Sequence, residues 1–119
     1  MDSVLWVLQI VLAVVFLGAG FMKLARPKSA LEPQMGWVVD FSGNHVKGIG
    51  ALEVLGALGL ILPAVTGIAP VLVPLAALGL ALLMIGAAVV HSRRGEVVPF
   101  VIVNVVLLIL ALVVAFGRF

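Results

Sequence analysis

Four long apolar runs, separated by short polar segments, make up most of this chain. The runs cover residues 4–22, 46–62, 68–90 and 97–116, and their most polar interior positions are Gln9, Glu53 and Asn104. About 20 apolar residues in a helix are needed to cross the hydrocarbon layer of a bilayer. The pattern therefore predicts four membrane-spanning helices, over about residues 4–24, 46–62, 68–91 and 97–116.

The connections between these runs are short, with one exception between the first two. Pro70, Pro74 and Pro99 lie near the starts of the third and fourth runs, where a missing backbone N–H does least harm to a helix. Pro63 lies where we expect the second helix to stop. We therefore predict an all-α integral membrane protein, in which residues 1–119 form a single up-and-down four-helix bundle.

The long connection between the first two runs has a pattern of its own. Its apolar residues recur at the spacing of an amphipathic helix: Leu31, Met35, Val38 and Val39. Trp37 suits the headgroup level of a membrane. We predict a short amphipathic helix at the membrane interface, which serves either as an anchor or as a lid over a pocket.

Composition agrees with a membrane setting and excludes several function classes. Of 119 residues, 65% are hydrophobic and 10% are charged, and the mean hydropathy is +1.40, far from the values of soluble domains. The chain has no cysteine, which excludes thiolate metal sites and thiol exchange by this chain alone. Two histidines do not make a metal ligand set, and no basic stripe indicates nucleic acid binding.

The distribution of Lys and Arg predicts an orientation. In an up-and-down bundle one end collects Lys23, Arg26, Lys28, Lys47, Arg93 and Arg94, whereas the other end has only Arg118. The end richer in Lys and Arg usually faces the cytoplasm. The start, Met1 to Ser3, lacks the basic region of a signal peptide, so the first run is expected to be retained as a spanning helix. Both termini are then predicted to be extracytoplasmic.

Glu53 is the main candidate for a functional residue. It lies well inside an apolar run rich in small residues, with Gly56 and Gly59 on the same side of a helix. A carboxylate at that depth costs on the order of 2–3 kcal/mol or more unless it is paired or protonated. Glu53 is either a structural tie between helices or a pocket residue, and we favour the pocket.

Other polar residues are expected at a similar depth or at the rim. Asn104 and Met84 fall near the level of Glu53, and Lys23 can reach down its helix towards the carboxylate. We predict a cavity that opens to the cytoplasm, with Gly56 on its floor and no polar group able to orient a ligand at the other end of the bundle. The predicted catalytic residues are Glu53, Lys23 and His91. The predicted ligand-binding residues are Glu53, Lys23, Asn104, Trp37, Gln34, Met84 and Arg94. Simpler roles stay open: Arg94 as a topology anchor, Asn104 in a helix–helix hydrogen bond and His91 as an interfacial residue.

Several of these segments together resemble the DoxX-like membrane proteins. The matching stretches are GAGFMKLARP (18–27), EPQMGWVVDF (32–41), GIGALEVLGALGLILP (48–63), residues 66–96 and the helix of Asn104. The resemblance implies a four-helix bundle in a cell membrane, such as the bacterial inner membrane, with Lys23, Glu53 and His91 to Glu96 at the family's polar positions. It also implies an association with redox or sulfur metabolism, because the family name comes from a small subunit of a thiosulfate:quinone oxidoreductase.

Three functions remain in view from the sequence. The first is a membrane subunit that binds a quinone or similar lipophilic molecule for a redox or sulfur-metabolism partner. The second is a stand-alone enzyme that uses Glu53 as general acid or base on a lipid-like substrate. The third is a structural membrane anchor. Expected partners are the lipid bilayer, a lipophilic ligand, and a redox protein or a second copy of the chain. No cofactor is expected other than a bound quinone or lipid.

Overall fold

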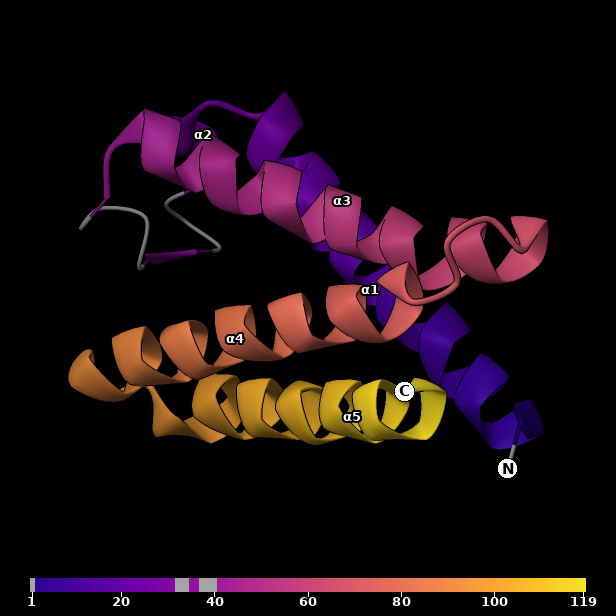
Figure 1. Ribbon diagram of the computed structural model, residues 1–119. Coiled ribbons are helices and arrows are strands. Elements are labelled where there is room, and N and C mark those ends of the chain that lie inside the picture. The colour runs from indigo at the N-terminus through magenta and orange to yellow at the C-terminus, as the bar shows by residue number, and fades with distance from the viewer. Residues whose placement is uncertain (1, 32–34, 37–40) are drawn as a thin grey trace.

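Helices form nearly all of the part of the chain that the structure describes. The structure is a computed structural model, which describes residues 2–31, 35–36 and 41–119. The elements are α1 (Asp2–Ala25), α2 (Lys28–Leu31), α3 (Gly43–Thr66), α4 (Leu72–Arg93), the π-helical segment η2 (Val97–Val101) and α5 (Ile102–Arg118) (Figure 1). Four helices are long and apolar enough to cross a membrane. The expected all-α membrane bundle is therefore confirmed.

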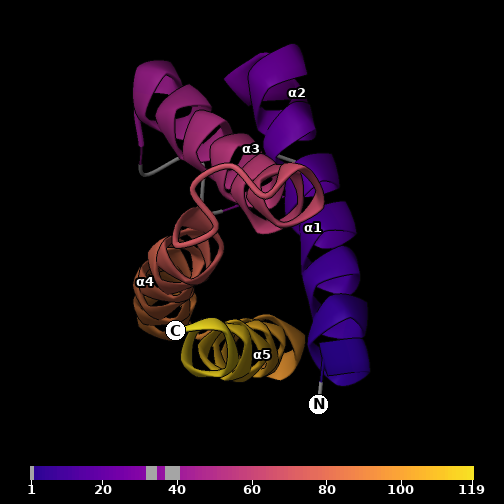
Figure 2. The same cartoon turned by 45° about the vertical axis from the view of Figure 1, so that its right-hand side comes forward.

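The four long helices pack as two pairs. α1 lies along α3 and α4 lies along α5, while α3 contacts α4 and α1 contacts α5 over shorter lengths. Figure 2 shows the four helices around a common centre. In Figure 1, α3 and α4 converge at the turn that joins them and diverge away from it. We call the end with residues 67–71 the turn end, and the end with Lys23, Lys47 and Arg93 the basic end.

Two hydrophobic clusters hold the fold together. The larger one joins all four long helices through fully buried side chains that include Leu12, Phe16, Leu60 and Leu80. The smaller one consists of Leu31 and Val46, with Met22, Met35 and Phe41 packed against them. This second cluster fixes the described part of the α1–α3 connection onto the bundle at the basic end. One short helix, α2, is present there, while Gln34 and Trp37 lie outside the described residues.

The end of α3 and the start of α4 differ from the bounds predicted from the sequence, and each lies near a proline. α3 does not stop at Pro63 but continues to Thr66, and the N–H of Gly67 then donates to the carbonyl of Pro63 at 3.0 Å. Gly67 has φ 71, a left-handed conformation that glycine adopts without strain. α4 begins at Leu72, because Pro70 disfavours the helical conformation at Ala69, which has φ 48.

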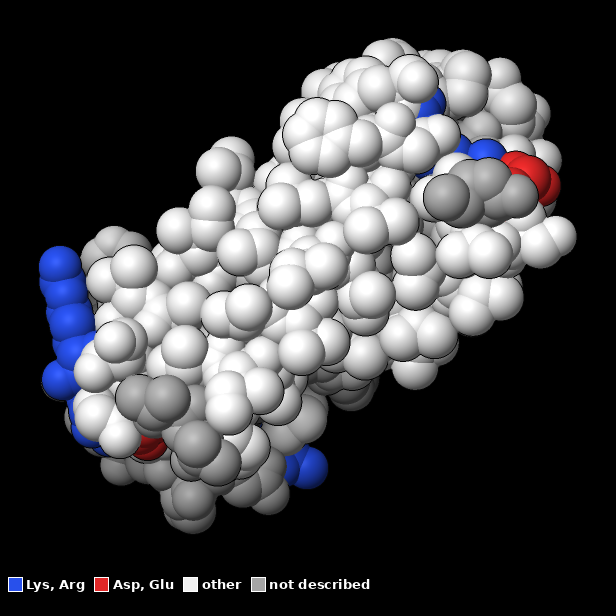
Figure 3. Space-filling view, turned by 90° about the horizontal axis from the view of Figure 1, so that it is seen from below, with Lys and Arg blue, Asp and Glu red and all other residues white. Residues whose placement is uncertain are grey.

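The surface of the bundle is apolar between its two ends. Figure 3 shows Lys and Arg at the two ends of one face, with a broad belt free of charged residues between them. Large apolar side chains point outwards from each long helix, among them Val14, Leu55, Leu82 and Phe116. Such a belt would be unfavourable in water and suits a hydrocarbon layer. The chain is therefore a multi-pass membrane protein.

We propose that the basic end faces the cytoplasm, and cysteine labelling tests this orientation. Ser29 and Ser92 are exposed at the basic end, and Ile68 is exposed at the turn end. In intact cells, Ser29→Cys and Ser92→Cys should be protected from a membrane-impermeant thiol reagent, and Ile68→Cys should react. The chain has no cysteine of its own, so the background is clean. The reverse labelling pattern would overturn the orientation while leaving the four-span fold intact.

Candidate functional site

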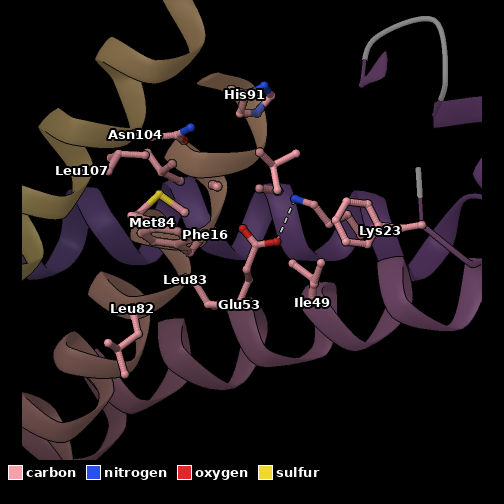
Figure 4. A pocket seen from close by; sticks show the side chains of 16 residues that line it. Phe16, Lys23, Ile49, Glu53, Leu82, Leu83, Met84, His91, Asn104 and Leu107 are labelled. Atoms are coloured by element: carbon pink, nitrogen blue, oxygen red, sulfur yellow. Dashed lines mark ion pairs between the residues drawn. The ribbon is translucent and has the colours of Figure 1, made fainter. Parts of the chain in front are cut away.

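One cavity of about 380 Å³, which we call the main cavity, lies among the four long helices, towards the basic end (Figure 4). Each of these helices contributes to its lining: Phe16 and Lys23 from α1, Glu53 from α3, Met84 and His91 from α4, and Asn104 from α5. The rest of the lining is mostly aliphatic. The structure thus brings together five of the residues predicted from the sequence: Lys23, Glu53, Met84, His91 and Asn104.

Lys23 and Glu53 form an ion pair at the cavity wall. Nζ of Lys23 lies 2.7 Å from Oε1 of Glu53, and the two side chains are only 8% and 5% exposed. Figure 4 shows this contact between α1 and α3. A buried ion pair of this kind offers a ligand both a cationic donor and an anionic acceptor inside the membrane.

Two glycines explain why this pair can form. Gly20 and Gly50 face each other where α1 crosses α3, one turn before Lys23 and Glu53 respectively. A Cβ atom at Gly20 would lie 2.6 Å from the carbonyl oxygen of Gly50, and one at Gly50 would lie 2.7 Å from Cβ of Lys23. Small residues allow helix backbones this close approach in a membrane. The close crossing sets Lys23 opposite Glu53.

His91 connects the cavity to the surface at the basic end. Its Nδ1 lies 3.0 Å from Oε1 of Glu96, which also accepts a hydrogen bond of 3.0 Å from Nε of Arg94. The hydrogen bond with His91, followed by that from Arg94, lowers the pKa of Glu96, so this residue is an ionised acceptor. Because a carboxylate only accepts, Nδ1 of His91 is the donor in this hydrogen bond. The ring stacks on Phe100 with centroids 5.0 Å apart.

Asn104 brings a polar group to the α5 side of the cavity. The residue is 8% exposed, and its Nδ2 is buried without a hydrogen-bond partner among the described residues. Buried polar atoms normally have a partner, so an orphan amide that lines a cavity is a candidate ligand contact. The simpler expectation of a helix–helix hydrogen bond finds no support at this nitrogen.

Of the predicted binding residues that the structure describes, Arg94 does not line the cavity. Arg94 belongs to the surface group with Glu96 and lies against Gly36, where an added Cβ would be 2.9 Å from its guanidinium. Trp37 and Gln34 lie outside the described residues. Phe41, which follows them in the chain, does line the cavity.

The turn end carries a polar network that the sequence analysis missed. Gln9 is fully buried; its Nε2 donates to the carbonyl of Leu60 at 2.7 Å, and its Oε1 accepts from Nε of Arg118 at 2.7 Å. Arg118 also donates from Nη1 to Oδ1 of Asp2 at 2.6 Å. Asp2 and Arg118 line a second cavity of about 390 Å³ with Trp6. The expectation of no orienting polar group at this end is therefore wrong.

This network could have been suspected from Gln9. It is the one strongly polar residue of the first apolar run, and a buried amide needs partners. Its partner Arg118 is 109 residues away, and only the packing of α5 against α1 brings the two together. The network ties α1, α3 and α5 at the turn end.

Comparisons with known proteins agree with this architecture at the level of the family. No curated protein and no solved structure matches the chain. The DoxX-like family matches residues 7–114, which include α3, α4, most of α1 and α5, and every polar residue of the main cavity. With its membrane-spanning bundle and this match over most of its length, the chain belongs to the DoxX-like family.

Proposed function

We propose that this protein binds a quinone, or a similar lipophilic ring compound, in the main cavity and serves a redox partner in the membrane. One observation carries the proposal. The buried Lys23–Glu53 ion pair shares an otherwise apolar cavity with His91 and with the amide nitrogen of Asn104, which has no hydrogen-bond partner among the described residues. An apolar cavity with a few convergent polar groups is the usual form of a small-molecule site.

The polar groups suit the chemistry of a quinone ring. A quinone has two carbonyl oxygens on opposite sides of an apolar ring, and each accepts hydrogen bonds. Lys23 on α1 and Asn104 on α5 supply donors from different helices. Reduction to the quinol adds two electrons and two protons to these oxygens. The electrons would come from the redox partner and the protons from groups beside the ring.

His91 and Glu96 supply a route for those protons. His91 lines the cavity, and its partner Glu96, 26% exposed at the side chain, reaches the surface at the basic end. The His91 ring can therefore pass a proton between the cavity and the aqueous side through a hydrogen bond of 3.0 Å. Glu53, next to Lys23, is the second proton-exchanging group of the cavity.

A structural anchor is the second candidate function, and one observation favours it. The Lys23–Glu53 pair lies beside the Gly20–Gly50 crossing and links the same two helices. A pair in that position would stabilise the bundle whether or not a ligand binds. The amide nitrogen of Asn104, on α5, has no part in such a tie and supports the binding function instead.

Titration of the purified protein in lipid nanodiscs with decylubiquinone tests the binding function. Wild-type protein should bind the quinone, and Asn104→Ala should weaken binding by about two- to tenfold, the worth of one hydrogen bond. Asn44→Ala is the matched control, because Asn44 is exposed at the start of α3 and does not line the cavity. Absence of quinone binding to the wild-type protein, with only phospholipid retained, would favour the anchor.

A further inference from the structure

We propose that the site takes a ligand with a polar ring and a long apolar tail, and that the tail leaves the cavity sideways between α3 and α4, past Leu82 and Gly86. The ligand would then enter from the hydrocarbon layer of the membrane rather than from water. This inference rests on the proposed function and adds to it the class of ligand and its route.

The cavity holds about 380 Å³, close to the lower end of the roughly 300–1,000 Å³ range of small-molecule sites. That volume accommodates a ring with small substituents but not a long alkyl or isoprenoid chain as well. The tail of a membrane lipophile must therefore emerge through the cavity wall.

Leu82 and Gly86 line the cavity and are also exposed on the outside of the bundle, Leu82 to 69%. They lie one turn apart on α4, and Gly86 has no heavy atom within 4 Å of the position of a Cβ. The cavity thus reaches the outer surface at a point where one residue has no side chain to block it.

The packing of α3 against α4 changes along the two helices. Nearer the turn end these helices are in tight contact: a Cβ at Gly56 would lie 2.7 Å from Leu80, and one at Gly59 would lie 2.8 Å from Ala76. Towards the basic end the two helices diverge (Figure 1). Leu82 and Gly86 are eleven and seven residues from the end of α4 at Arg93, about 10–16 Å along the helix, a depth within the hydrocarbon layer.

Two other sides of the cavity are less suited to a tail. At the basic end Phe41 lines the cavity and packs on the cluster of Leu31 and Val46, so an aromatic side chain occupies part of the wall on that side. On α1 the lining residue Val15 is 40% exposed and carries a branched side chain. Val15 is less exposed than Leu82, and an exit past Val15 is included in the test.

Tryptophan substitutions at two glycines of α4 test the opening. Gly86→Trp should lower the affinity for decylubiquinone about tenfold more than it lowers the affinity for the same ring without a tail, because the ten-carbon tail loses its path. Gly79→Trp is the matched control: Gly79 lies two turns earlier on the same side of α4, is exposed, has open space beside it and does not line the cavity. It should change neither affinity. The route would be overturned if Gly86→Trp left the ratio of the two affinities unchanged. It would also be overturned if Val15→Trp lowered this ratio and Gly86→Trp did not.

A second probe separates this inference from the proposed function. A long-chain alcohol with a photoreactive group at its hydroxyl end should label Phe16 or Met84 inside the cavity of the wild-type protein. Gly86→Trp should abolish that labelling and Gly79→Trp should not. If no quinone binds but this pattern holds, the lateral route stands and the quinone assignment fails. If no quinone binds and Gly86→Trp leaves the labelling unchanged, both are overturned. Labelling that never reaches Phe16 or Met84 also overturns the route.

Discussion

Replacing Lys23 by methionine is expected to lower the free energy of unfolding by about 3–5 kcal/mol, the usual cost of removing one partner of a buried ion pair. The variant leaves the carboxylate of Glu53, 5% exposed at its side chain, without its cation. Reversible unfolding in mixed micelles, followed by circular dichroism, measures the loss. A change below about 1 kcal/mol would show that Lys23 does not compensate Glu53.

Glu53→Gln should be much milder, because the two residues lie at different depths. Lys23 is two residues from the end of α1, so without its partner the long side chain can turn towards the interface. Glu53 is ten residues from the start of α3 at Gly43, about 15 Å along the helix, and cannot reach water in that way. Glutamine keeps the size of the side chain and a hydrogen-bonding group, so this variant should stay folded.

The double variant Lys23→Met/Glu53→Gln decides between the two candidate functions. It should regain most of the stability lost in Lys23→Met, since no buried charge is left uncompensated. If the cavity binds a quinone, the refolded double variant should nevertheless bind decylubiquinone weakly or not at all. A double variant that regains stability and binds the quinone like wild type would show that the pair only ties helices together.

The sequence was informative about depth. The lengths of the apolar runs and the positions of Lys23, Glu53 and Asn104 within them define distances from the membrane surface, because each residue advances a helix by about 1.5 Å. Lys23, Glu53 and Asn104, which the sequence places at similar depths from the basic end, do line the same cavity. Their roles in binding and catalysis stay predictions.

The sequence was less informative about which helix faces meet. Gly56 was expected on the floor of the cavity, but it packs against Leu80 and does not line the cavity. The Gln9–Arg118 hydrogen bond joins α1 to α5, and no local sequence pattern identifies Arg118 as the partner of Gln9. The rotation of a helix and its choice of neighbour depend on the fit between side chains that are far apart in the sequence. The periodicity within one helix gives no information about this fit.

The Gly20–Gly50 crossing is the packing feature on which the site depends most. Gly20→Ala should lower the free energy of unfolding by about 1–3 kcal/mol, the usual cost of overpacking a tight contact. The added Cβ would lie 2.6 Å from the carbonyl oxygen of Gly50 and 2.8 Å from Cγ2 of Val54. A backbone oxygen cannot rotate away as a side chain can, so α1 and α3 would have to move apart.

Gly18→Ala is the matched control for this substitution, on the same helix two residues earlier. A Cβ at Gly18 would meet no heavy atom within 4 Å, and alanine is favoured over glycine in a helix by up to about 1 kcal/mol. This variant should therefore be as stable as wild type or more stable. Separation of α1 from α3 should also pull Lys23 away from Glu53, so Gly20→Ala, unlike Gly18→Ala, should weaken decylubiquinone binding. If the two variants unfold alike, the close crossing does not set the Lys23–Glu53 pair, and the geometry of the site must depend on other contacts.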